Sequence, residues 1–309
     1  MTIWRMRDLD VVFISYDEEC ADENYSWLAQ HTPRPPLRVH GVKGFHNAYL
    51  CASNAAATPR FVTVDADNRV LESRFFDLLI DDRSLDDIVF SFNSRNSVNG
   101  LTYGNGGIKC WPKALLPQVL THECSDGGSG GLNSIDFNYV CRYYRVGFLA
   151  SETICNATPY HAFRAGYREA VKLSLPNKDR SDVWLENLGK LGPPILNWIK
   201  IWLSVGSDTP NGIWTILGAR TGLVDYWRGG FSLEKLSDYA YFSSLWKAYA
   251  HLSDDDAFSM ADELSEGLSA MKLNCPILDP DTSAWFKGVF LQPSYSGRFD
   301  HSKPSPLKK

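Results

Sequence analysis

The chain has 309 residues, of which 44% are hydrophobic, 13% aromatic and 22% charged, and its formal net charge is −5. This composition is typical of a compact soluble protein with a large core, arranged in one large or two modest domains. The negative net charge argues against a protein that coats nucleic acid through bulk electrostatics, although it leaves room for a local basic groove.

The cysteines and the apolar segments bear on the cellular compartment. Seven cysteines are scattered along the chain without a Cys-x-x-Cys pair, which favours reduced thiols and argues against a zinc site. The charged start, with Arg5, Arg7 and Asp8, lacks the apolar core of a signal peptide. The most apolar run, 195–205, is too short to span a membrane. We therefore expect a cytoplasmic protein with no membrane partner.

The first half of the chain alternates between predicted strands and predicted helices. Apolar runs predict strands at 10–17, 37–40, 61–64, 87–92 and 146–150. Helices are expected between them, through Trp27 and Leu28 and at 45–57, 75–80 and 132–144. This order predicts an α/β fold in which a mostly parallel sheet is flanked by helices.

From Pro159 onward the pattern becomes helical. Helices are predicted at 160–175, 194–204, 233–252 and 254–271, and Ser253 is the expected N-cap of the last one. The proline-rich remainder is expected to be a strapping segment that ends in a basic tail. We therefore expect an α/β domain at 1–158 and a mainly helical extension at 159–309.

The strand at 61–64 runs directly into two acids that are one residue apart, Asp65 and Asp67. Strand ends at the rim of an α/β sheet are where such folds bind ligands. Two carboxylates at this spacing can hold Mg²⁺ or Mn²⁺ while the phosphates of a substrate complete the coordination. The alternative is an ordinary strand end with solvated acids, because short motifs also match by chance.

Two other segments could meet phosphate. The segment 103–113 contains three glycines that permit close approach of the backbone to a ligand. Arg164, Arg168 and Lys172 form one basic stripe on the predicted helix 160–175, and its alternative is a solvated face with local ion pairs. The glycine motifs of dinucleotide-binding, P-loop and α/β-hydrolase proteins are missing from the sequence. The pattern therefore favours a phosphate site that relies on acids and a metal.

Several stretches together resemble the GT-A superfamily of glycosyltransferases, and in particular the family-two-like enzymes of bacteriophages. The resemblance lies in Val11–Asp17, in Val42–Gly44 followed by Asn47, in Val64–Asp67 and in Tyr103–Pro112. The similarity to phage enzymes continues in Phe163–Lys172, in Trp202–Gly206 and in Ile216–Arg220.

The resemblance implies transfer of a hexose from a nucleotide-diphosphate sugar, such as a UDP-glucose-type donor, with Mn²⁺ or Mg²⁺ as cofactor. Asp65, Asp67 and His161 are then the expected metal ligands, and Asp65 also belongs to the donor site. A capping or surface role is the alternative for His161. The other expected donor-binding residues are Ser15, Tyr16, Asp17, Lys43, Asn47, Gly106, Gly107, Arg164 and Arg168.

The general base departs from the superfamily pattern. Members that invert the anomeric centre often carry Glu-Asp-x-Asp-Phe, whereas the matching stretch here is Asn133–Phe137, with Ser134 at the position of the base. Either Asp126 or Asp136 supplies the catalytic carboxylate, or the reaction proceeds with retention and needs no such base.

The phage resemblance implies that the acceptor is a hydroxymethylated pyrimidine in double-stranded DNA, foremost 5-hydroxymethylcytosine, which must be flipped out of the helix. Tryptophans in the helical half could line an acceptor groove, although packing between helices is the alternative for most of them. They are Trp184, Trp198, Trp202, Trp214 and Trp227. A glycan acceptor and a non-catalytic nucleotide-sugar-binding protein are the other interpretations, and the oligomeric state is open.

Overall fold

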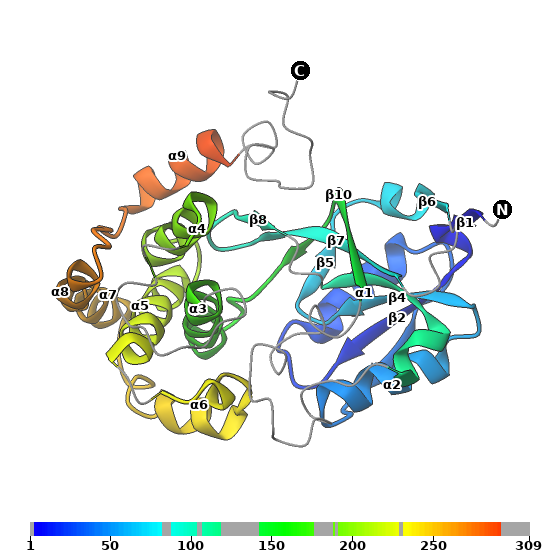
Figure 1. The fold of residues 1–309 in the computed structure, drawn as a ribbon, viewed down its shortest axis with the longest axis horizontal. Coiled ribbons are helices and arrows are strands. Elements are labelled where there is room, and N and C mark those ends of the chain that lie inside the picture. The colour runs from blue at the N-terminus through cyan, green and yellow to red at the C-terminus, as the bar shows by residue number, and fades with distance from the viewer. Residues whose placement is uncertain are drawn as a thin grey trace. The chain divides into compact units, whose positions relative to one another are not determined.

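The computed structural model describes residues 3–81, 88–103, 107–118, 142–175, 188, 191–228 and 231–291. The chain divides into two compact units (Figure 1). The first contains the residues up to Asn96 together with Thr102–Ile154. The second contains Ser97–Leu101 together with the described residues from Cys155 onward. The first unit is built on a sheet and the second is helical (Figure 1).

Within the described residues of the first unit, eight strands form one sheet in the order β3-β2-β4-β9-β7-β10-β5, with β8 paired to β7. The strands are β2 (Asp10–Ser15), β3 (Leu37–His40), β4 (Arg60–Asp65), β5 (Asn68–Val70), β7 (Ile88–Asn96), β8 (Thr102–Tyr103), β9 (Ile108–Pro112) and β10 (Arg142–Thr153).

The sheet is mixed, which corrects the expectation of a mostly parallel one. Strand β2 runs parallel to β3 and β4, and β7 runs parallel to β10. Strand β9 is antiparallel to both β4 and β7, and β5 is antiparallel to β10. The sequence of β9 by itself carries no information on the direction in which that strand enters the sheet.

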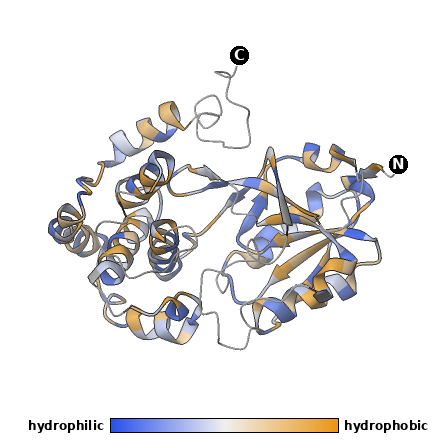
Figure 2. Cartoon of the chain, viewed as in Figure 1, coloured by the Kyte–Doolittle hydropathy of each residue, from blue (hydrophilic) through white to orange (hydrophobic). Residues whose placement is uncertain are grey.

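The central strands are buried on both faces, which explains their continuous apolar sequences. Along β4, Val62 and Val64 pack in an apolar cluster with residues of α1 (Ala21–His31). The intervening Phe61 packs in a second cluster with residues of α2 (Phe45–Ala55). Successive side chains of a strand point to opposite faces, so one helix covers each face here. Figure 2 shows the hydrophobic character of these strands.

The helix predicted at 75–80 is wrong, and the one predicted at 132–144 is wrong at 142–144, the part of it that the structure describes. Residues 75–77 belong to a short 3-10 helix, η2 (Ser73–Asp77). Residues 79 and 80 belong to β6 (Leu79–Asp81), which pairs with β1 (Ile3–Arg5). The consecutive Phe75 and Phe76 are both buried in the core, which does not match the spacing of one helical stripe. Residues 142–144 belong to β10, and the rest of the helix predicted at 132–144 lies outside the described residues.

The described part of the second unit contains seven α-helices. They are α3 (Pro159–Ser174), α4 (Pro193–Ser204), α5 (Gly212–Arg228), α6 (Tyr239–Trp246), α7 (Asp254–Glu263), α8 (Ser265–Ala270) and α9 (Pro280–Phe290). The predictions for α3 and α4 are confirmed, whereas the helix predicted at 254–271 is divided at Leu264. The helix predicted at 233–252 consists of a 3-10 helix, η8 (Leu233–Ser237), then α6 and a series of turns.

Helix α5 was not expected from the sequence, because glycines interrupt its pattern. Those glycines lie where α5 meets α3. A Cβ on Gly218 would lie 2.0 Å from the Phe163 carbonyl oxygen, and one on Gly166 would lie 2.0 Å from that of Thr215. The missing side chains therefore allow the two backbones to pack closely, at the usual cost of glycine in a helix.

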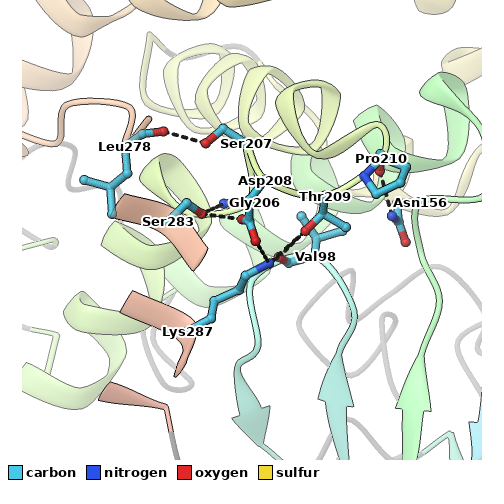
Figure 3. A network of polar contacts seen from close by, with 10 residues as sticks. All are labelled: Val98, Asn156, Gly206, Ser207, Asp208, Thr209, Pro210, Leu278, Ser283 and Lys287. Atoms are coloured by element: carbon cyan, nitrogen blue, oxygen red, sulfur yellow. Dashed lines mark hydrogen bonds and ion pairs between the residues drawn. The ribbon is translucent and has the colours of Figure 1, made fainter. Parts of the chain in front are cut away.

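Helix α9 replaces part of the expected strapping segment. It begins at Pro280, a residue suited to the first helical position, and Asp279 caps it by accepting a hydrogen bond from the Thr282 backbone N–H. Lys287 of α9 donates to the Asp208 carboxylate at 2.6 Å and to the Thr209 hydroxyl at 2.8 Å (Figure 3). These contacts attach α9 to the loop that precedes α5.

Arg220 of α5 is fully buried and joins several elements of the second unit. Its guanidinium donates to the backbone carbonyls of Leu203, Ala261 and Cys275, and to the Ser265 hydroxyl. Burial lowers the pKa of Arg220 to about 10, so the group stays charged at neutral pH. None of the described helices has the length and apolar character needed to cross a bilayer.

Candidate functional site

The candidate site lies at the end of β4, where the chain turns through Ala66 and Asp67 into β5. Strand β2 ends beside it, because Ile14 is the parallel partner of Asp65. Tyr49 of α2, which is almost fully buried, donates its hydroxyl to Asp65 Oδ1 at 2.8 Å. The Asp65 backbone N–H donates to the Gly107 carbonyl at 2.8 Å. The carboxylate of Asp65 is thus fixed from α2, and its backbone is fixed from the segment before β9.

The turn itself is held by its backbone on two sides. The buried amide of Asn24 in α1 donates to the Ala66 carbonyl at 2.8 Å. The Asp67 carbonyl accepts from the Ile154 N–H, just after β10, at 2.6 Å. Because both carbonyls are hydrogen-bonded to the scaffold, the backbone of the turn is held in place beneath its two acids.

Asp67 is partly buried and carries a disfavoured negative charge. Its Oδ1 accepts from the Asn68 amide at 2.6 Å, which favours the ionised form. Burial and, next, the charge of Asp65 outweigh that bond and raise the pKa of Asp67 to about 7. Glu18 adds to the repulsion. A cation placed at this turn would relieve the repulsion, and such a perturbed carboxylate is a mark of functional sites.

The neighbouring Cys20 is a thiol rather than a thiolate. Burial, together with the charge of Asp67, raises its pKa to about 11. Its Sγ lies 3.8 Å from the Ala66 carbonyl, to which it can donate weakly. Cys20 therefore packs against the turn as a neutral thiol and is not suited to act as a nucleophile.

The expected nucleoside-binding residues lie at and after the end of β2. Ser15 is buried, and its hydroxyl lies 3.0 Å from His40 Nδ1 and accepts from Arg38 Nε at 3.1 Å. Tyr16 and Asp17 are exposed and follow directly. Ser15 is thus suited to positioning His40 at this edge, while Tyr16 and Asp17 are the ones open to a ligand.

The other expected donor-binding residues of the first unit lie in two places. Lys43 precedes α2 and Asn47 lies in its first turn, and both are exposed. Gly107 is buried beside Asn68, so it lies against the acid turn. Gly106, with the catalytic candidates Asp126 and Asp136, falls outside the described residues.

The expected residues of the second unit lie on α3. His161 is the third residue of the helix, and both its backbone N–H and its Nδ1 lie within hydrogen-bond distance of the N-cap hydroxyl of Thr158, at 3.2 and 2.7 Å. This geometry agrees with the capping alternative, and its role as a metal ligand stays a prediction.

The basic stripe of α3 is half-buried rather than solvated. The Arg164 guanidinium lies 4.1 Å from the ring centroid of Tyr239, and Lys172 pairs with Glu169 at 3.3 Å. Arg168 is also half-buried. Lys172 therefore has the local ion pair that the alternative interpretation expected, whereas Arg164 lies over an aromatic ring; a grip of Arg164 and Arg168 on a diphosphate stays a prediction.

The tryptophans of the second unit mostly belong to its core. Trp202, Trp214 and Trp227 are buried, and Trp214 donates its ring N–H to Asp254 at 2.7 Å. Trp198 is half-buried, and Trp184 lies outside the described residues. The packing alternative is therefore confirmed for the three buried rings.

The donor set at the turn suits a hard divalent cation only in part. Carboxylate oxygens of Asp65 and Asp67 are the ligands that Mg²⁺ and Mn²⁺ prefer. Within the described residues, no group of three or more His, Cys, Asp and Glu side chains is placed to hold a metal. The residues therefore fit a cation that shares its coordination with water and substrate phosphates.

The sequence did not reveal Tyr49, Asn24 and Asn68, which hold the two acids. Asn68 is adjacent to Asp67, so its place could have been noted. Tyr49 and Asn24 lie on helices and resemble ordinary helical residues, and their role depends on contacts across 16 and 42 residues of sequence.

No protein-family model matches the sequence, and no curated protein matches it. Among solved structures, one that matches is a glycosyltransferase involved in the glycosylation of the major capsid of PBCV-1, with 12% sequence identity and a TM-score of 0.31. The match covers 49% of this chain and 98% of that chain. A likeness this distant carries no functional conclusion, which has to come from the site.

Proposed function

We propose that the chain is a glycosyltransferase of the GT-A type that binds a nucleotide-diphosphate sugar at the Asp65–Asp67 turn with the help of Mn²⁺ or Mg²⁺. The observation that carries the proposal is the fixed pair of carboxylates at the end of β4, in which burial and Asp65 raise the pKa of Asp67 to about 7. The order of the motifs around the pair, which resembles that of the superfamily, supports the same assignment.

A bound cation would act as a Lewis acid on the diphosphate leaving group. Asp65 and Asp67 would hold it, with Tyr49 fixing one carboxylate and Asn68 the other. Tyr16 and Asp17, exposed after β2, are suited to contact the nucleoside. Arg164 and Arg168 are proposed to contact the diphosphate, and Asp126 or Asp136 to act as a base if the reaction inverts the anomeric centre.

For the acceptor, we propose the hydroxymethyl group of 5-hydroxymethylcytosine in double-stranded DNA. The resemblance of Phe163–Lys172 and Ile216–Arg220 to phage enzymes supports this choice. The buried Trp202, Trp214 and Trp227 do not add to it, since they serve the core. The competing acceptor is a glycan, and the competing function is nucleotide-sugar binding without transfer.

The test is mass spectrometry of DNA containing 5-hydroxymethylcytosine after incubation with the protein, Mn²⁺ and a panel of nucleotide sugars. The proposal predicts a mass gain of one hexose with one donor, and no gain when EDTA replaces Mn²⁺. Parallel reactions contain unmodified DNA, free sugars and oligosaccharides. Transfer to a sugar but not to DNA would favour the glycan acceptor. If the protein neither transfers the sugar to any acceptor nor hydrolyses the donor, enzymatic function is contradicted.

A further inference from the structure

Asn68, the residue after Asp67, is almost fully buried and has both ends of its side-chain amide engaged. Its Nδ2 donates to Asp67 Oδ1 at 2.6 Å. Its Oδ1 lies within hydrogen-bond distance of three hydroxyl groups, those of Ser151 at 2.8 Å, Thr153 at 3.1 Å and Ser94 at 3.2 Å. The amide oxygen faces donors and the amide nitrogen faces a carboxylate, so the orientation of the group is set from both sides.

The three hydroxyls come from neighbouring strands of the sheet. Ser94 lies on β7 and is the parallel partner of Ser151 on β10, while Thr153 on β10 is the antiparallel partner of Asn68 itself. Ser94 and Ser151 are buried like Asn68. Apolar residues at these positions would leave a buried amide oxygen without donors, which is costly. The polar residues on β7 and β10 thus support the amide of Asn68.

Gly107 provides the space that the amide occupies. A Cβ at this position would lie 1.9 Å from Asn68 Nδ2 and 2.1 Å from its Cγ. Real side chains do not approach so closely, so any other residue at position 107 would push the amide out of its place. The position of the Asn68 amide therefore requires a glycine at position 107, independently of any contact between Gly107 and a ligand.

We propose that Asn68 is the positioning residue of the metal site: its amide holds Asp67 Oδ1 and thereby presents Oδ2 to the cation. This inference rests on the proposed function, since it takes a divalent cation to bind at Asp65 and Asp67. Ser94, Ser151, Thr153 and Gly107 act through Asn68. A carboxylate fixed through one oxygen offers the other in a single direction, as partners behind metal ligands commonly ensure.

The test measures the affinity for Mn²⁺ alone, by electron paramagnetic resonance of the free ion, in wild-type protein and in variants. Asn68→Ala and Gly107→Ala are expected to weaken Mn²⁺ binding by about 10- to 100-fold. Ser151→Ala is expected to weaken it severalfold. In the double variant Asn68→Ala/Ser151→Ala, the second substitution is expected to have no further effect, because Ser151 acts through the missing amide.

Asn54→Ala is the matched control, because Asn54 is an exposed asparagine in the last turn of α2. Thermal unfolding of each variant checks that it is folded, and the mild Ser151→Ala change serves if Asn68→Ala does not fold. If the wild type binds Mn²⁺ and the Gly107→Ala and Ser151→Ala variants bind it with unchanged affinity, this inference is overturned while the proposed function stands. If the effects of Asn68→Ala and Ser151→Ala on Mn²⁺ affinity add fully in the double variant, Ser151 does not act through Asn68. Absence of Mn²⁺ binding by the wild type would overturn the metal site and the inference together.

Discussion

The described carboxylates whose pKa values are shifted lie in opposite environments in the two units. In the second unit, hydrogen bonds from Ser253 lower the pKa of Asp256, and hydrogen bonds from Thr282 lower that of Asp279. In the first unit, burial and Asp65 raise the pKa of Asp67 to about 7. The helix caps stabilise the charge they carry, whereas the turn after β4 destabilises it. A charge that the fold disfavours indicates a function other than stability.

Two cationic side chains of the second unit, one buried and one half-buried, have matching partners. Arg220 is matched by three carbonyls and a hydroxyl, and Lys287 is matched by Asp208. Both serve to join helices and loops. We therefore propose that the chemistry lies at the Asp65–Asp67 turn and that these two cations have a structural role.

The largest effect is expected at Asp67. Replacing it by Asn keeps the shape but removes the charge that the cation needs, so hexose transfer should fall by about 1000-fold or more. Incorporation of labelled hexose into acceptor DNA measures the effect. Asp255→Asn, which changes an exposed acid in the first turn of α7, should retain wild-type activity. If the Asp67→Asn variant transfers hexose at a rate within about tenfold of the wild type, the proposed metal dependence is contradicted.

Arg220 should matter for stability instead. Arg220→Met leaves the carbonyls of Leu203, Ala261 and Cys275 without their donor, and we expect a loss of about 3 to 4 kcal/mol in the free energy of unfolding. Urea unfolding measures it. Arg74→Met serves as the control, because Arg74 is exposed and pairs with the exposed Glu72. Equal unfolding midpoints for the two variants would show that the buried guanidinium does not hold the second unit together.

The protonation of Asp67 should appear in the pH dependence of stability. The folded pKa of about 7 lies above the unfolded value of 3.8, so the folded state retains a proton that the unfolded chain has released. This contribution is present below the unfolded pKa and is lost as the pH rises through about 7.

In EDTA, the wild type should therefore lose about 4 kcal/mol of unfolding free energy, relative to Asp67→Asn, between pH 4 and pH 8. Urea unfolding of both proteins across this range gives the difference. Parallel pH profiles for the two proteins would show that the charge of Asp67 is not disfavoured in the folded state.

The smallest effect is expected at the N-cap of α3. Thr158→Ala removes the acceptor of the His161 N–H and should cost about 1 kcal/mol of stability, whereas Thr158→Ser should not. Thermal unfolding of the two variants measures the difference. If His161 is a capping residue only, Mn²⁺ affinity is unchanged in both. A loss of Mn²⁺ affinity in Thr158→Ala would instead favour His161 as a metal ligand.

The parts of the fold that the sequence predicts are those encoded by local patterns. The runs predicted as strands at 10–17, 37–40 and 61–64 correspond to β2, β3 and β4, and β4 ends at Asp65. The direction of β9 was not predictable, because it depends on pairing between distant segments. Helix α5 was hidden by glycines that only close packing against α3 explains.

The site was predictable to a similar degree. The spacing of Asp65 and Asp67 after an apolar strand is a local signal, and it identified the turn. The support from Asn68 was not predictable, since its hydroxyl partner Ser151 is 83 residues away. The reason why Gly107 must be a glycine also lies in Asn68, and the sequence alone suggested a ligand there instead.

The proposed chemistry requires that the Asp65–Asp67 turn binds a nucleotide diphosphate through a divalent cation. Calorimetric titration of UDP into the wild-type protein, with Mn²⁺ and then with EDTA, tests it most directly. We predict saturable binding with Mn²⁺ that is lost in EDTA and in the Asp67→Asn variant. Binding that is equally strong in EDTA, or no binding of UDP or of other nucleoside diphosphates in the presence of Mn²⁺, would contradict it.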